Sequence, residues 1–291
     1  VDPMGQPPLK PFEQVAGLVN GVHKIFMHID PELGKQFGEM MHLGLLDLES
    51  RKGKAPGGYQ NTLAESRKPF IFMNAVGVDS DVRTLLHEGG HAFHAFASAA
   101  EPLLSYRHAP MEFCEVASMT MELLGNDFLG EFYDVRDSRR SIQHHLESVV
   151  QILAWVATVD AFQHWIYRYP GHDRRERSRT WEEIYQKFNG TETDWFGLEE
   201  IRRALWHRQL HIFEVPFYYI EYGIAQLGAL QIWRNAKKDW RGAMTKYKAA
   251  LALGGSRSLP ELFAVAGIEF DFSERTIAPL LDEVVRQLEL S

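Results

Sequence analysis

The sequence predicts a mainly α-helical fold with a small β element placed directly before a histidine-rich helix. Apolar residues recur at three- and four-residue steps over most of the chain, which is the spacing of amphipathic helices. Pro and Gly clusters interrupt this pattern, and the only good strand candidates lie around the cluster "APGGYQN". The 291 residues are enough to bury a sizeable core.

The elements follow in order from these signals. The first two helices are expected at Pro11–His28 and Pro31–Met41. Two strands should pair around the Gly-rich turn, Tyr59–Leu63 and the Phe-, Ile- and Val-rich Pro69–Val76. Nine further helices are expected at Asp81–Ala99, Pro110–Leu124, Asp137–Arg168, Thr180–Asn189, Gly197–Leu210, Tyr219–Asp239, Trp240–Leu253, Leu259–Ala266 and Ser273–Leu290. The third of these, near the middle of the chain, is interpreted as a scaffold helix in the core.

Charge and composition narrow the possible partners and location. The 31 basic residues are outnumbered by 39 acidic ones, giving a net charge of −8, so nucleic acid is not expected as a partner. No apolar run approaches the ~18 residues of a membrane span, and we expect no membrane partner. The single Cys114 excludes an internal disulfide, and the start "VDPMGQPPLKPFEQV" has no signal-peptide pattern. These features predict a cytoplasmic location.

The stretch "TLLHEGGHAFHAF" carries the strongest chemical signal. Its "HEGGH" places His87 and His91 four residues apart, so both imidazoles lie on one helix face and can hold one zinc ion. Glu88 can then take a proton from water at the metal. A chance match is the alternative, but buried histidines and a buried glutamate are costly without a partner such as a metal. Gly89 and Gly90 also predict that something approaches the helix backbone closely.

A third ligand should follow downstream, because two histidines leave a zinc site incomplete. The carboxylates after His91 are those of Glu101, Glu112, Glu115 and Glu122. Glu112 is explained by its place in the first turn of a helix, where the dipole favours negative charge. Glu115 lies between apolar neighbours and needs a cation, so it is predicted as the third ligand. Glu112 is predicted as a hydrogen-bond partner of a ligand histidine.

These motifs together resemble peptidase family M3, the zinc metallopeptidases that include thimet oligopeptidase and oligoendopeptidase F. The resemblance rests on "HEGGHAFH" followed, 24 residues after His91, by "EVAS". It implies a gluzincin-type zincin fold, one Zn²⁺ held by His87, His91 and Glu115, and Glu88 as general base. The stretch "GGYQNTLAESRKPFIFMN" resembles the hairpin that leads to the zinc helix in oligoendopeptidase F-like members, and an edge strand there would let a peptide dock.

The chain departs from the family in length, since members are roughly twice as long by this resemblance. Residues 1–291 are therefore interpreted as a single M3-like catalytic domain that lacks the family's N-terminal half. That half of the same gene product is a candidate partner, and short peptides are the expected substrates.

The stretch "WHRQLHIFEVPFYYIEYG" resembles the family's histidine followed by a Tyr- and Gly-rich loop. Tyr218 and Tyr222 are predicted as hydrogen-bond donors to the oxyanion of the transition state. His211 is predicted to contact the substrate or the oxyanion. Aromatic core packing is the alternative explanation of such a cluster.

The sequence thus predicts a zinc-dependent endopeptidase that hydrolyses short peptides, with catalytic residues Glu88, His211, Tyr218 and Tyr222. Two alternatives stay open. One is a catalytically weak peptide-binding or assembly module that keeps the zinc site, and the other is a carboxypeptidase or dipeptidase on the same scaffold.

Overall fold

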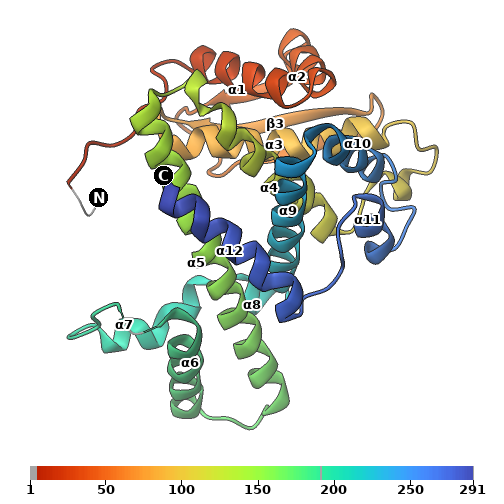
Figure 1. Cartoon of the computed structure of the whole chain (residues 1–291). Coiled ribbons are helices and arrows are strands. Elements are labelled where there is room, and N and C mark those ends of the chain that lie inside the picture. The colour runs from red at the N-terminus through yellow and green to blue at the C-terminus, as the bar shows by residue number, and fades with distance from the viewer. Residues whose placement is uncertain (1–4, 191, 291) are drawn as a thin grey trace. The chain divides into compact units, whose positions relative to one another are not determined.

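The computed structural model describes residues 5–190 and 192–290 and confirms a mainly helical chain with one small sheet (Figure 1). It forms two compact units, unit 1 with residues 1–144 and 227–291 and unit 2 with residues 145–226. The elements are α1 (Val15–Ile29), α2 (Pro31–Leu43), β1 (Leu46–Glu49), β2 (Tyr59–Leu63), β3 (Lys68–Ala75), α3 (Asp79–Ser98), α4 (Met111–Gly125), α5 (Val135–Arg168), α6 (Arg174–Asn189), α7 (Glu199–Ala204), α8 (His211–Glu214), α9 (Ile220–Lys238), α10 (Trp240–Leu251), α11 (Leu259–Val265) and α12 (Glu274–Leu290), with 3-10 helices at Leu104–Arg107, Asn126–Glu131 and Leu205–Arg208.

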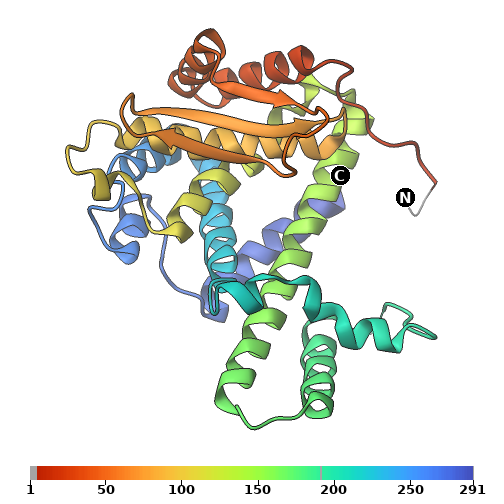
Figure 2. The same ribbon diagram turned by 180° about the vertical axis from the view of Figure 1, so that it is seen from behind.

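Unit 1 contains the sheet, in the order β1-β3-β2. The strand β3 pairs in parallel with β1 and antiparallel with β2, so the predicted hairpin is confirmed and β2 lies at an edge of the sheet. Figure 2 shows α3 lying along one face of the sheet and α1 and α2 beside its β1 edge, and both of these helices also contact α3. Alternate residues of β3 are buried, as the two-residue period of a strand requires; these are Pro69, Ile71, Met73 and Ala75.

The start of α3 is fixed to the end of β3 by one carboxylate. Oδ2 of Asp81 accepts hydrogen bonds from the backbone N–H groups of Val76, Gly77 and Val78 at 2.8, 2.8 and 3.0 Å. These bonds satisfy backbone donors that the helix start and the loop leave open. Gly77 has a φ of +90°, which a residue without a side chain adopts readily. The sheet therefore determines where the histidine-rich helix begins.

The two glycines of "HEGGH" let α3 pack closely against its neighbours. A Cβ at Gly90 would lie 2.5 Å from Cα of Ser118 and 2.6 Å from the carbonyl oxygen of Ala117, both on α4. A Cβ at Gly89 would lie 2.4 Å from the ring of Phe26 on α1. The close approach expected from the sequence is confirmed, and the approaching groups are the α4 backbone and an aromatic ring.

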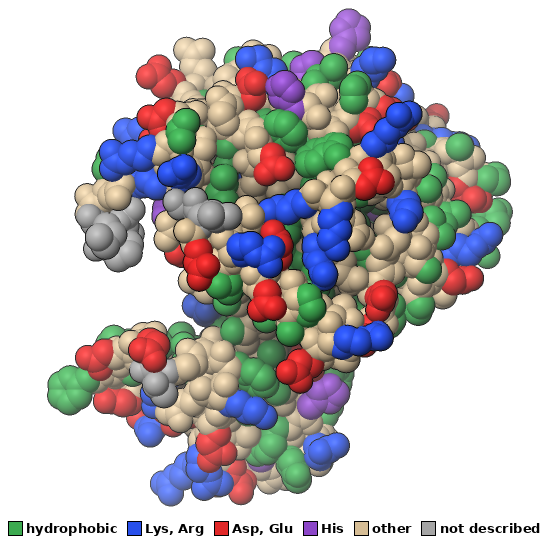
Figure 3. All heavy atoms as spheres, in the orientation of Figure 1, with side chains coloured by type: hydrophobic (Ala, Val, Ile, Leu, Met, Phe, Trp, Pro, Cys, Tyr) green, Lys and Arg blue, Asp and Glu red, His purple; other side chains and the backbone are tan. Residues whose placement is uncertain are grey.

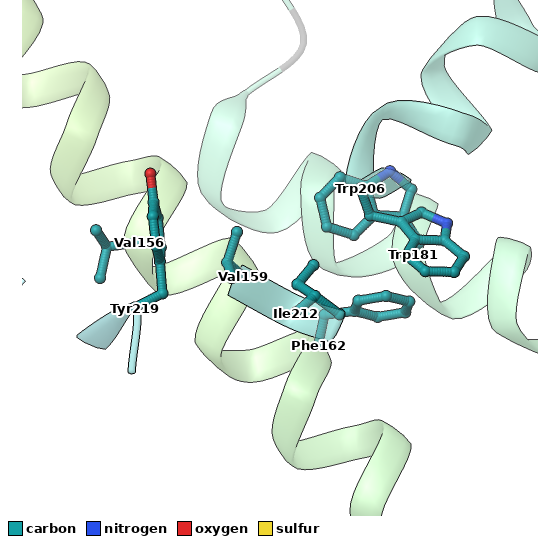
Figure 4. Close-up of a cluster of buried hydrophobic side chains, with 7 residues drawn as sticks. All are labelled: Val156, Val159, Phe162, Trp181, Trp206, Ile212 and Tyr219. Carbon is teal, nitrogen blue, oxygen red and sulfur yellow. The ribbon is translucent and has the colours of Figure 1, made fainter. Parts of the chain in front are cut away.

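Unit 2 is built around a cluster of aromatic and branched side chains. Trp181 of α6 is fully buried and contacts the rings of Trp155 and Phe162 from α5. Figure 4 shows the buried members of this cluster converging from α5, α6, the 3-10 helix and the α8–α9 segment: Val156, Val159, Phe162, Trp181, Trp206, Ile212 and Tyr219. The cluster gives this unit a core of its own.

Several element predictions are corrected by the structure. The four-residue strand β1 was not predicted, and Gly197–Leu210 is a short α7 followed by a 3-10 helix rather than one helix. Helix α6 begins at Arg174 instead of Thr180, because Asp173 and Glu176 form a reciprocal capping box with bonds of 2.8 and 2.9 Å. The mixed-charge stretch "DRRERSR" is therefore the start of a helix.

Helix α5 is long and apolar enough to cross a membrane, judged by its length and composition alone. This is weak evidence, because core helices of soluble proteins pass the same test, and 39% of its apolar window is buried. The search of the sequence for uninterrupted apolar runs did not single it out, because polar residues are interspersed along it. The expected absence of a membrane partner stays a prediction, as does the interpretation of residues 1–291 as a single catalytic domain.

Candidate metal centre

Three predicted ligands, His87, His91 and Glu115, come together between α3 and α4. Their ligand atoms all lie within 4.8 Å of one another. Oε2 of Glu115 is 3.2 Å from Nε2 of His87 and 3.7 Å from Nε2 of His91. The two imidazole rings meet edge to face at 4.9 Å between centroids, neighbours because they are four residues apart on one helix.

Each ligand side chain is held by a further hydrogen bond. Nδ1 of His87 lies 2.7 Å from Oε1 of Glu122, which turns Nε2 toward the cluster. His91 hydrogen-bonds the backbone of Cys114. The Oγ of Ser118 donates to Oε2 of Glu115 at 3.0 Å. Such partners fix the orientation of metal ligands and raise the basicity of a ligand histidine.

The charges of the cluster also favour a cation. Burial opposes protonation of His87, but the carboxylates of Glu115 and Glu122 outweigh it and raise the pKa of His87 well above its usual value. Burial, helped by the charge of His87, lowers the pKa of His91 to about 4. Burial acts to raise the pKa of Glu115, yet the two histidines lower it overall. The site therefore combines a neutral imidazole and a carboxylate with one strongly held proton, which a metal ion can replace.

The donor set and its spacing fit zinc. Two imidazole nitrogens and one carboxylate oxygen are the ligands of many catalytic zinc sites, which keep a fourth position for water or substrate. Ligand atoms about 2.0–2.2 Å from zinc at tetrahedral angles stand roughly 3.3–3.6 Å apart. The measured 3.2 and 3.7 Å separations are close to that range.

Glu88 lies beside the three ligands, between α3 and the edge strand β2. It is 6% exposed, and it accepts a hydrogen bond from the backbone of Gln60 on β2. Within the part of the chain that the structure describes, its Oε2 is buried without a hydrogen-bond partner. Burial raises the pKa of Glu88 to about 7; the charge of His87 opposes this shift and that of Glu115 adds to it. Such a carboxyl can exchange a proton near neutral pH.

Comparison with known proteins decides the family. The sequence model of peptidase family M3 matches residues 23–280, which is most of the chain. The chain belongs to peptidase family M3. The oligopeptidase PepF of Bacillus subtilis is 24% identical over 251 residues, and the oligoendopeptidase F homologue of Borreliella burgdorferi is 23% identical over 248. The solved structure of PZ peptidase A with an inhibitor superposes with a TM-score of 0.87 at 30% identity.

The chain covers only part of the length of these similar proteins. The matches cover 83% and 81% of this chain but 37% and 41% of the two curated relatives. The match to PZ peptidase A covers 98% of this chain and 50% of that one. The chain thus spans about two fifths of the curated relatives and half of the solved structure.

The predicted His211, Tyr218 and Tyr222 also gather, but in unit 2. The ring of His211 lies 5.7 Å from that of Tyr218 and 5.9 Å from that of Tyr222, centroid to centroid, and Tyr219 joins the group at 5.0 Å. Nδ1 of His211 is 2.6 Å from Nε2 of Gln209. The three residues therefore form one cluster, and their catalytic roles stay predictions.

Sequence reasoning missed Glu122 as the carboxylate that holds His87. Glu112 was predicted for that role, yet it lies in the first turn of α4, away from the hydrogen bonds of the cluster. A signal for Glu122 was present: it follows Glu115 by seven residues, two helical turns, and so lies on the same face of α4. A residue on that face can reach a histidine that Glu115 also contacts.

Proposed function

We propose that this chain carries the catalytic centre of a zinc-dependent oligopeptidase that hydrolyses short peptides. The observation that carries the proposal is the convergence of His87, His91 and Glu115, with the carboxyl of Glu88 beside them. Membership of family M3 and the names of the relatives, an oligopeptidase and an oligoendopeptidase F homologue, support the same reaction class.

The edge strand β2 supplies a place for an extended peptide. Its neighbour on one side is β3, and as an edge strand it offers backbone groups on the other. A peptide that pairs with β2 would be held by main-chain hydrogen bonds, which suit substrates of varied sequence. Because Glu88 contacts the backbone of Gln60 on this strand, such a peptide would run past the proposed base.

The chain's residues divide the chemistry between them. Bound zinc would act as a Lewis acid toward water and the scissile carbonyl. Glu88 accepts a proton from the attacking water and later gives it to the leaving amine. Glu122 and Ser118 keep His87 and Glu115 in place during the reaction. We further propose that Tyr218 and Tyr222 donate hydrogen bonds to the oxyanion and that His211 contacts the substrate.

The decisive experiment removes the base and leaves the ligands. Glu88→Gln should keep about one zinc per chain, while peptide hydrolysis falls by about 10²–10⁴-fold, the usual contribution of a general base. Metal analysis and a quenched-fluorescent peptide assay measure the two effects. Glu112→Gln, which removes a carboxylate of α4 outside the cluster, should change neither. Undiminished hydrolysis by Glu88→Gln would refute the assignment of the base.

The same assay separates the alternatives. Peptide binding without cleavage by the zinc-loaded wild type would indicate a binding module. Mass spectra of the products distinguish internal cuts from terminal ones, and hence an endopeptidase from a carboxypeptidase or dipeptidase. The cytoplasmic location, the absence of nucleic-acid partners and association with a separate N-terminal half stay predictions.

A further inference from the structure

A groove of unit 1, remote in sequence from the metal ligands, runs between the C-terminal half of α9, the loop 267–269 and α12. It consists of two adjoining hollows of about 330 and 430 Å³. Arg234 and Lys238 of α9 line both hollows. Figure 3 shows Lys and Arg side chains gathered on the face where α9 and α12 lie in Figure 1. We call this the α9–α12 groove.

The α9–α12 groove is cationic in a protein that is acidic as a whole. Its described lining has two more basic than acidic side chains, whereas the whole chain has a net charge of −8. The basic residues are Arg234, Lys237, Lys238, Arg275 and Arg286, and the acidic ones are Glu269, Asp282 and Glu283. The local excess of positive charge is opposite in sign to the net charge of the chain, so this surface differs in charge from the protein as a whole.

The excess is concentrated on the two residues shared by the hollows. Glu283 pairs with Lys237 at 3.4 Å and with Arg286 at 2.5 Å, and the negative charge of Asp282 in the same hollow offsets the second of these cations. Arg275 lies 3.3 Å from Glu269. Among the described residues, neither Arg234 nor Lys238 has an acidic partner within 4 Å. They are four residues apart on α9, where two like charges destabilise a helix, so an anion bound between them would be stabilised by both.

Hydrogen bonds hold the walls of the groove in place. Gln231 bonds the backbone of Glu269 in both directions, at 3.0 and 2.9 Å. Nδ2 of Asn235 donates to the carbonyl of Gly267 at 3.0 Å. On the opposite wall, Leu280 of α12 is 1% exposed and anchors that helix. The loop 267–269 is therefore tied to α9 by the chain's own hydrogen bonds.

We propose that the α9–α12 groove binds a phosphate group, with Arg234 and Lys238 as its contacts. Arginine and lysine are the usual ligands of phosphate, the first through its planar fork and the second as a point charge. A phosphate dianion neutralises the local excess of two positive charges, whereas a single carboxylate neutralises only one of the two. The hollows are larger than one phosphate, so the group can come as the free ion or on a small organic phosphate.

The test is calorimetric titration at fixed ionic strength with two probes, inorganic phosphate and glycerol phosphate. The groove variant combines Arg234→Gln with Lys238→Gln. A control variant combines Lys35→Gln with Arg241→Gln, two exposed cations of α2 and α10 that give the same charge change elsewhere. We expect saturable binding by the wild type and the control, and at least roughly tenfold weaker binding by the groove variant, as for the loss of a charged hydrogen bond.

Two results overturn the proposal: wild-type protein that shows no saturable binding of either probe, or equal affinities in all three proteins. Lys238→Gln alone provides a second test, because this side chain is exposed and forms no hydrogen bond or ion pair with the residues that the structure describes, so its loss leaves the fold intact. It should also weaken binding. If the wild type binds glycerol phosphate more tightly than inorganic phosphate, the ligand is an organic phosphate. If it binds glycerol phosphate no more tightly than inorganic phosphate, the ligand is the free ion. Both variants leave the three zinc ligands in place, so any phosphate bound at the metal centre contributes equally in all three proteins and cannot produce the expected difference.

Discussion

The candidate metal centre of unit 1 and the aromatic cluster of unit 2 are both built around histidines, but they are held differently. His87 is oriented by the carboxylate of Glu122, and its neighbours carry charge. His211 is oriented by the amide of Gln209 and surrounded by three tyrosine rings at 5.0–5.9 Å. The first site selects a cation, whereas the second offers neutral hydrogen-bond donors and a shaped surface.

This difference explains why the sequence indicates a metal at the first site but leaves both packing and catalysis open for the second. Buried charges need a partner of opposite charge, so their presence in an apolar stretch points to a metal. Aromatic residues pack well without any ligand, and their clustering is compatible with a core as well as with a catalytic site. The predictions below test the difference, from the largest expected effect to the smallest.

Tyr218→Phe and Tyr222→Phe test whether the aromatic cluster serves catalysis at all. If each hydroxyl donates to the oxyanion, each change should lower kcat by about 10²–10³-fold and leave zinc content unaltered. Steady-state kinetics and metal analysis measure these quantities. Tyr219→Phe is the matched control, since Tyr219 is buried in the same cluster and packs with the core of unit 2. Equal kcat values for all three variants would assign the cluster to packing alone.

Glu122→Gln tests the partner of the ligand histidine. The amide keeps the shape but loses the charge that supports His87, so zinc affinity should fall by about 10–100-fold. Competition with a chromogenic chelator measures the affinity. Glu112→Gln should bind zinc as the wild type does. An unchanged affinity in Glu122→Gln would mean that the 2.7 Å contact contributes no support to the metal.

Gly90→Ala tests the packing beneath the site. The added Cβ would lie 2.5 Å from a backbone atom of Ser118, so α3 and α4 must move apart, at a cost of about 1–3 kcal/mol in the free energy of unfolding. Denaturant titration measures this cost. Gly130→Ala is the control, because a Cβ there meets nothing within 4 Å. If both variants unfold alike, the close helix contact contributes little to stability.

Local spacing made much of the site predictable. Two histidines four residues apart on a helix must share a face, and Glu115 stood out as a carboxylate among apolar neighbours. The need for a close contact at Gly89 and Gly90 was also visible in the sequence. The groups that make the contact, Phe26 and the α4 backbone, were not, because they depend on how distant segments pack.

The misses share a physical cause as well. Strand β1 has only four residues, too few to show a period, and it is defined by its pairing with β3. His145 of the long helix α5 is only 9% exposed, which the sequence did not reveal because helix periodicity does not say which other elements cover a face. In contrast, the capping box at Asp173 is visible in the sequence as an Asp-x-x-Glu pattern before a helix. It would have predicted the correct start of α6.

The crossing of α3 and α4 has a consequence for the energetics of metal uptake. Gly90 lies between the two histidines, and it touches Ser118, which holds Glu115. One backbone contact thus sets the reach from both imidazoles to the carboxylate, and it is made by packing alone. The entropy of gathering the three donors is lost when the polypeptide folds, so an arriving ion meets a receptor that is already assembled.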